Sequence, residues 1–295
     1  MIKIATGLAA ITVISLSHTA FASSLPQERD ILDKEKPKNI LKIDDFLPEK
    51  KKWTLSTGIS ILNKSGDGSS PLFYLNEISP GHYILNKGTQ TYQKETNGVS
   101  AHSSLIYGIT DELAVGATVN GQWQNNQYTF DDGKKAVNDK YQFNGVGLGG
   151  SYQTYLFSDY TVFFSGINIK ESKIKSYTLG TSLNWIYDPL VLNLSLGYLD
   201  GISRERFSNN YTAYTTGGSV IFAVNPEVNI RWGFSKDFIY TQNNLLSQKS
   251  WSSNTSLLIG TIVNLTDRVS TDINIKGGVG NNKISTVSVS LSYKI

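Results

Sequence analysis

The segment His102-Ser103-Ser104 holds the residues whose types and spacing come nearest to a hydrolytic site. A histidine and a serine two positions apart share one side of an extended strand, because strand side chains alternate between faces. Such a pair supplies a base and a nucleophile, and the base needs a carboxylate or an amide to orient it. Hydrolysis of a membrane lipid is therefore the first chemistry to weigh.

The neighbouring residues argue against that chemistry. Alternation places His102 and Ser104 on the polar side of their segment, with Ala101 and Leu105 on the apolar side that a lipid would meet. The next apolar segment, 113–118, carries no acid or amide that could orient the histidine. We therefore predict that the protein is not an enzyme and has no catalytic residues.

Metal chemistry finds equally little support. Beyond residue 22 the chain has His82 and His102 as its histidines, no cysteine, and no close cluster with ligand spacing. Asp131, Asp132 and Asp139 are candidates for a calcium loop, but a solvated loop is the simpler interpretation. The sequence thus predicts no metal and no cofactor.

The elements around these residues have the two-residue period of β-strands. Apolar residues alternate with Asn, Ser, Thr, Gly, Asp and Lys in the segments 53–61, 113–119, 146–152, 179–185, 190–198, 228–234, 257–263, 269–275 and 287–295. Such segments are typical of strands with one face in lipid, although the core strands of a β-sandwich alternate as well. The connections between them must decide.

Tight and mostly longer connections alternate along the chain. Short turns with Asp, Pro or both lie at 109–112, 157–159, 187–189, 225–227 and 266–268, and the other connections span roughly 64–97, 125–139, 170–174, 200–210, 241–249 and 280–283. This order predicts an all-β, up-and-down antiparallel transmembrane barrel over 53–295. We expect about twelve strands, with short periplasmic turns and both barrel ends on that side. A hairpin around 82–91 would change the count by two.

The first 22 residues have the layout of a secretory signal peptide. A basic start precedes an apolar run over 4–17, and Ala20-Phe21-Ala22 is a small-x-small cleavage site, so cutting is expected after Ala22. The run is too short to span a bilayer as a retained helix. An exported barrel of this kind belongs in the outer membrane of a Gram-negative bacterium.

Residues 23–52 form a separate charged periplasmic segment. Half of them are charged, and Pro26, Pro37 and Pro48 interrupt them. We expect a soluble tail with a short helix around 40–46, and a disordered leader is favoured over a periplasmic partner segment or a plug in the lumen.

Aromatic and polar side chains predict two further sets of residues. Interfacial belts that contact outer-membrane lipids and lipopolysaccharide are expected at Trp53, Tyr107, Trp123, Trp185, Tyr198, Trp232, Tyr240, Trp251 and Tyr293. Lumen-lining side chains are expected at Asn120, Gln122, Asn144, Asn184, Asn193, Asn229, Arg231, Asp237, Asp272, Asn274 and Lys276.

The predicted lining is mixed and mostly neutral. It favours a narrow, porin-like passage for small polar or amphiphilic solutes, and a closed structural or surface barrel is the alternative. The net charge of +3 is too small and too dispersed to indicate a nucleic-acid partner.

Four turn motifs resemble those of one family of outer-membrane transporters. The stretch 105–116 (LIYGITDELAVG) resembles its strand-turn-strand motif, and 188–198, 225–227 and 265–268 resemble its later turns. This is the family similar to the meta-pathway of phenol degradation, and the resemblance covers 53–295. It implies a channel or transporter role, without catalytic residues. Outer-membrane barrels usually end in an aromatic residue that the barrel-assembly machinery binds, whereas this chain ends in Ile295, so either Tyr293 substitutes or a variant of the machinery is involved.

Overall fold

The computed structural model describes residues 48–156, 159–171, 173–201, 209–243, 249–280 and 283–295. The predicted signal peptide, the predicted helix at 40–46 and most of the charged segment lie outside these residues. In the described part of the chain, no helix has the length and apolar character needed to cross a membrane.

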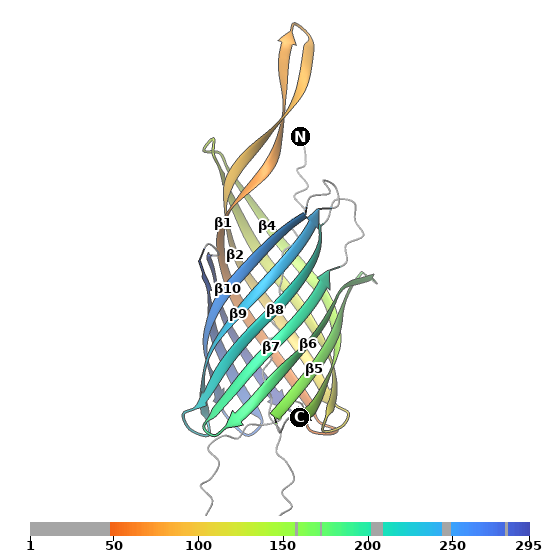
Figure 1. Ribbon diagram of the computed structural model, residues 1–295, viewed down its shortest axis with the longest axis vertical. Coiled ribbons are helices and arrows are strands. Elements are labelled where there is room, and N and C mark those ends of the chain that lie inside the picture. The colour runs from red at the N-terminus through yellow and green to blue at the C-terminus, as the bar shows by residue number, and fades with distance from the viewer. Residues whose placement is uncertain (1–47, 157–158, 172, 202–208, 244–248, 281–282) are drawn as a thin grey trace, which may run out of the picture.

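Twelve antiparallel strands close into one barrel, which confirms the predicted fold. Each strand pairs with its sequence neighbours, and β1 pairs with β12 (Figure 1). The strands are β1 (Trp53–Ser79), β2 (His82–Gly108), β3 (Leu113–Phe130), β4 (Lys135–Leu156), β5 (Asp159–Lys170), β6 (Lys173–Tyr187), β7 (Leu190–Gly201), β8 (Asn209–Ala223), β9 (Val228–Asn243), β10 (Lys249–Asn264), β11 (Val269–Val279) and β12 (Lys283–Lys294).

The two ends of the barrel differ in their connections. At one end, here called the turn end, side-chain oxygens of turn residues accept backbone hydrogen bonds. Thr110 Oγ1 accepts from Leu113 N (3.0 Å), and Asn225 Oδ1 accepts from Val228 N (2.7 Å). These local bonds satisfy backbone groups that leave the strand ladder, which explains the short polar turns. The opposite end, the loop end, carries the other connections.

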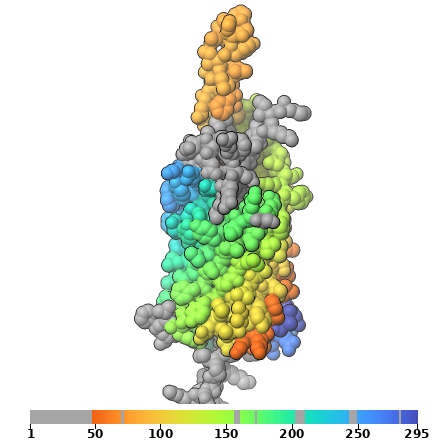
Figure 2. All heavy atoms as spheres, turned by 90° about the vertical axis from the view of Figure 1, so that its right-hand side faces the viewer, coloured from red at the N-terminus to blue at the C-terminus, as the bar shows by residue number. Residues whose placement is uncertain are grey.

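The prediction of a loop over 64–97 was wrong. β1 and β2 continue through it and pair with one another up to Ser79 and His82, so the hairpin adds no strand to the barrel. Beyond Ser65, β1 no longer pairs with β12, and the tip of the hairpin stands clear of the barrel (Figures 1 and 2). The predicted 125–139 connection is likewise mostly strand, with only 131–134 between β3 and β4.

The outward faces of the strands carry an apolar band. Ile59 on β1, Leu196 on β7 and Leu257 on β10 have 57%, 59% and 57% of their surface exposed. Apolar side chains so exposed on the outer surface of a barrel indicate contact with lipid. We call the opposite side of each strand the inner face.

A β-bulge in β4 changes which residues reach the inner face. Asn120 of β3 pairs with Gly145, whereas the next residue, Gly121, pairs with Phe143, so Asn144 is the additional residue. Gly145 adopts φ +102°, a conformation that residues with a Cβ rarely adopt. The bulge therefore lets Asn144 and Gly147 both face inward.

Candidate functional site in the barrel interior

The predicted lumen residues all fall on the inner face of their strands. Each alternates with outward residues of the apolar band, and each is buried or half-buried. They are Asn120 and Gln122 on β3, Asn144 on β4, Asn184 on β6, Asn193 on β7, Asn229, Arg231 and Asp237 on β9, and Asp272, Asn274 and Lys276 on β11.

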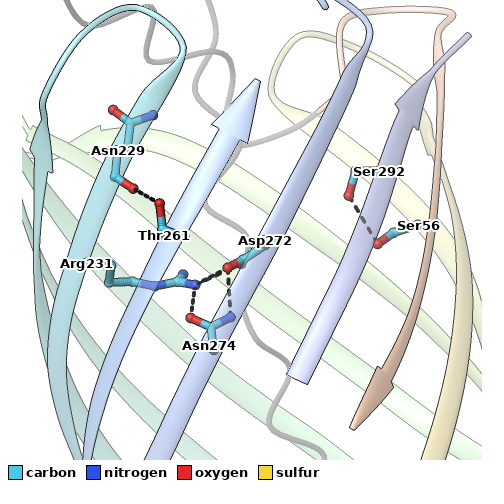
Figure 3. A network of polar contacts seen from close by, with 7 residues as sticks. All are labelled: Ser56, Asn229, Arg231, Thr261, Asp272, Asn274 and Ser292. Atoms are coloured by element: carbon cyan, nitrogen blue, oxygen red, sulfur yellow. Dashed lines mark hydrogen bonds and ion pairs between the residues drawn. The ribbon is translucent and has the colours of Figure 1, made fainter. Parts of the chain in front are cut away.

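Three of these residues form one polar cluster (Figure 3). Arg231 Nη2 donates to Asp272 Oδ1 and Oδ2 at 2.8 and 2.7 Å and to Asn274 Oδ1 at 2.6 Å. Asn274 Nδ2 donates in turn to Asp272 Oδ1 at 2.7 Å. The three residues are 7%, 5% and 7% exposed, so the ion pair is well shielded from bulk solvent. An unpaired charge at this buried position would destabilise the barrel, so the two side chains must stay in contact.

Gly260 makes this cluster sterically possible. Arg231 and Asn274 both pair with Gly260, which lies between them on β10. A Cβ at this glycine would overlap Asn274 Oδ1 and lie 2.8 Å from Ile273 O. The arginine therefore reaches β11 across a strand that has no side chain at that position.

Other predicted lumen residues form pairs. Asn193 Nδ2 donates to Asn184 Oδ1 at 2.6 Å, and Asn184 is fully buried. Thr215 Oγ1 donates to the buried Asp237 Oδ1 at 2.9 Å. Inward polar groups of neighbouring strands thus hydrogen-bond to one another, because buried polar groups need partners.

Between these clusters the inner face is lined by small residues. Glycine, serine and threonine recur on it along the strands, for example at Ser100, Gly116, Thr118, Gly147, Ser195, Gly197, Gly217 and Ser288. Apolar inner residues also occur, and Ala114, Val162, Val191 and Ala223, near the turn end, are buried. Ala213 and Ile239, which pair near the loop-side ends of β8 and β9, are buried as well.

The His102 segment is placed as predicted, with one correction. His102 is on the inner face, because a Cβ on inward Gly58 would lie 2.6 Å from His102 Cε1. The prediction that the next strand lacks an amide beside it was wrong, since Asn120 pairs directly with His102. In the described part of the chain, no hydrogen bond joins the His102 ring to Ser104 or Asn120.

No metal site emerges around the acidic residues considered above. In the part of the chain that the structure describes, no three His, Cys, Asp or Glu side chains group as metal ligands. Instead, Asp139 accepts a hydrogen bond from Asn125 Nδ2 at 2.7 Å, and Asp132 forms an ion pair with Lys134 at 2.8 Å.

Several of the predicted interfacial aromatics meet across neighbouring strands. Ring centroids of Trp53 and Tyr107 lie 4.5 Å apart at the turn end, and those of Tyr240 and Trp251 lie 5.0 Å apart near the loop end. Trp123 contacts Tyr141. Tyr198 contacts Tyr177 and Tyr214, whereas Trp232 pairs with Val220 and Ile259 within the apolar band. Trp185 and Tyr293 lie close to the turn-side ends of β6 and β12.

A solved structure of an outer-membrane channel shares this fold. The chain is similar to the COG4313 outer membrane channel from Pseudomonas putida F1, with a TM-score of 0.59 and 12% identity over 89% of this chain and 100% of that one. The NanC porin gives a TM-score of 0.45 with 12% identity, over 80% of this chain and 100% of that one.

At such identities the similarity shows the fold alone. No model of a known protein family matches the chain, and no curated protein matches it. The resemblance of 53–295 to the phenol-degradation family therefore remains a prediction.

One group of inward residues was missed at the sequence level. Lys64 and Lys94 lie in the segment 64–97, which was interpreted as a connection, and Lys140 directly follows the predicted connection 125–139, so alternation was not applied to them. The β-forming run Thr89-Gln90-Thr91-Tyr92-Gln93 was the available sign that these segments are strands.

Proposed function

We propose that this protein is an outer-membrane channel that passes small polar or amphiphilic solutes through a narrow lumen. The small side chains on the inner face at mid-barrel carry this proposal. A closed barrel needs large interdigitating side chains to reach the packing density of a protein interior. Glycine, serine and threonine instead leave space between opposite walls, while their hydroxyls and backbone suit water.

The strand number is compatible with such a passage. Eight strands give an interior that side chains can fill, and sixteen give an open channel, so twelve strands allow a narrow opening. The COG4313 protein is described as a channel and has the same fold, which supports the proposal by analogy.

The proposed location follows from the apolar band. A signal peptide cut after Ala22 would deliver the chain to the periplasm, and the barrel-assembly machinery would then insert it into the outer membrane. The outward leucine, isoleucine and valine side chains would contact lipid, and the aromatic pairs at both ends would lie near the headgroups and lipopolysaccharide.

A pair of tryptophan variants tests the passage. Gly147 faces inward, and a Cβ there would come no closer than 3.7 Å to Thr118, so Gly147→Trp should extend into the lumen without disturbing the wall. Gly277 faces outward, and a Cβ there meets nothing within 4 Å. In planar bilayers we expect stepwise conductance from the wild type, reduced conductance from Gly147→Trp, and unchanged conductance from Gly277→Trp.

The same recordings address the alternative of a closed structural or surface barrel. Absence of conductance from correctly folded wild-type protein would refute the channel and favour that alternative. We further propose that the barrel is not an enzyme, because the His102 ring has neither Ser104 nor Asn120 as a hydrogen-bond partner among the described residues.

A further inference from the structure

Four strands form a wall that rises above the rest of the loop end. β4 pairs with β5 only as far as Val146, and β1 pairs with β12 only as far as Ser65. Beyond these points β1–β4 continue to pair with one another. We call residues 62–69, 91–98, 124–130 and 135–140 the loop-end wall.

The wall begins where the apolar band ends. Ile61, Val99 and Trp123 are the last outward apolar residues of β1, β2 and β3 before it. The next outward residues are polar, and Asn63 Nδ2 donates to Asn97 Oδ1 at 2.6 Å. The wall therefore lies beyond the proposed lipid boundary, in contact with water.

Charged residues are distributed unevenly across this wall: its carboxylates all lie on the outer face, and its lysines lie on the inner face except Lys135. Strand alternation puts Lys64, Lys94 and Lys140 on its inner face, and no carboxylate occurs on that face within its described residues. The acidic residues Asp67, Glu95 and Asp139 alternate with them on the outer face. Since the two sets point in opposite directions, the inner lysines are not neutralised by the acidic residues of their own strands.

Two of the inner lysines lie close together. Lys64 pairs with Thr96, so Lys94 is its diagonal neighbour on β2. Partial burial lowers the pKa of both lysines, and the positive charge of Lys64 lowers the pKa of Lys94 further. In the described part of the chain neither lysine forms an ion pair, so a bound anion would relieve their repulsion.

Aromatic rings lie beside these charges on the same face. Lys94 Nζ lies 5.4 Å from the centre of the Tyr128 ring, with which it makes a cation–π contact. Tyr92 contacts the rings of Tyr128 and Phe130 at 5.5 and 6.0 Å between centroids. Tyr92 also leans over Gly68, where a Cβ would lie 2.5 Å from its Cζ. The rings therefore form a continuous apolar surface next to the lysines.

We propose that the inner face of the loop-end wall binds small carboxylates with an apolar body as they enter the barrel. The carboxylate lies between Lys64 and Lys94, and the apolar body lies on Tyr92, Tyr128 and Phe130. Ammonium groups bind carboxylates through charge-assisted hydrogen bonds, and the rings provide the apolar contact. The assignment rests on the proposed channel function, for which it names a class of solute.

Isothermal titration calorimetry with benzoate tests this site on the full mature chain. The double variant Lys64→Gln/Lys94→Gln keeps the side-chain length and removes both charges. We expect it to bind benzoate about tenfold more weakly than the wild type, and wild-type binding to weaken as salt is raised. Lys135→Gln is the matched control, because Lys135 lies on the outer face of the same wall and should not affect binding.

Two further ligands separate the parts of the site. Acetate lacks the ring and benzyl alcohol lacks the charge, so each should bind more weakly than benzoate. Undetectable benzoate binding, equal binding by the double variant, or equal binding of all three ligands would overturn the proposal. Conductance of the double variant in potassium chloride is measured in parallel, since its persistence would leave the channel intact if the carboxylate site fails.

Discussion

Replacing Asp272 by Asn removes the charge that neutralises Arg231 while keeping the size of the side chain. Arg231 Nη2 contacts both carboxylate oxygens of Asp272, and the two side chains are 7% and 5% exposed. Removing one partner of a buried ion pair typically costs about 3–5 kcal/mol. Asn274 still accepts from Arg231 at 2.6 Å, so we expect the lower value, about 3 kcal/mol.

A double-mutant cycle distinguishes the loss of pairing from loss of shape. Arg231→Met combined with Asp272→Leu removes both charges, and such apolar replacements are often neutral or stabilising by about 1–4 kcal/mol. The free energy of unfolding should therefore fall more in Asp272→Asn than in the double variant. The comparison needs Arg231→Met and Asp272→Leu alone, because the coupling energy is the departure of the two from additivity.

Urea unfolding in phospholipid vesicles, followed by the fluorescence of the five tryptophans, measures these differences. Variants must first show the heat-modifiable electrophoretic mobility of a folded barrel. If Asp272→Asn lowered the free energy of unfolding by less than about 1 kcal/mol, the reasoning would be refuted, because water would then already solvate the Arg231 charge.

Three other expectations concern Gly260 on β10, the β1–β2 hairpin and the His102 segment. Gly260→Ala should lower the free energy of unfolding by about 1–3 kcal/mol, since its Cβ displaces Asn274 from Arg231, and an unchanged urea midpoint would contradict this. Replacing residues 70–90 by Asn-Gly joins the paired Ser69 and Thr91, and should change stability by under about 0.5 kcal/mol, because these residues pair only with one another; a large loss would show that the hairpin supports the barrel. Wild-type protein should not hydrolyse phospholipid, and hydrolysis that disappears in His102→Ala would revive the enzyme hypothesis.

The barrel was predictable because its physical constraint is regular. Residues such as Leu192, Leu194 and Leu196 must face outward on one strand, and a period of two records this directly in the sequence. The tight turns were predictable for a related reason: Thr110 and Asn225 must supply oxygens for backbone groups leaving the ladder. Strand number and inner-face assignment follow from these two patterns.

Features without such a constraint were not predictable. Where β1 and β2 pass beyond the apolar band, both faces contact water, and alternation of hydropathy disappears although the strands continue. Likewise, Arg231 and Asp272 are 41 residues apart, and only the register across Gly260 brings them together. Asn120, the amide opposite His102, was missed because the register between two strands cannot be read from the sequence of one of them.

The period of two continues in the loop-end wall, beyond the apolar band, where the alternating residues differ in charge instead of hydropathy. Below the boundary, outward Ile61 contrasts with inward Ser60; above it, outward Asp67 and Glu95 contrast with inward Lys64 and Lys94. Two faces that both contact water have no hydrophobic reason to differ. The inner face carries lysines without a carboxylate among the described residues of the wall, whereas the outer face carries three carboxylates and Lys135, and this excess of positive charge inside supports the proposed carboxylate site. The benzoate titration examines that difference directly, since Lys135 and Lys94 belong to one wall and differ in the face they occupy.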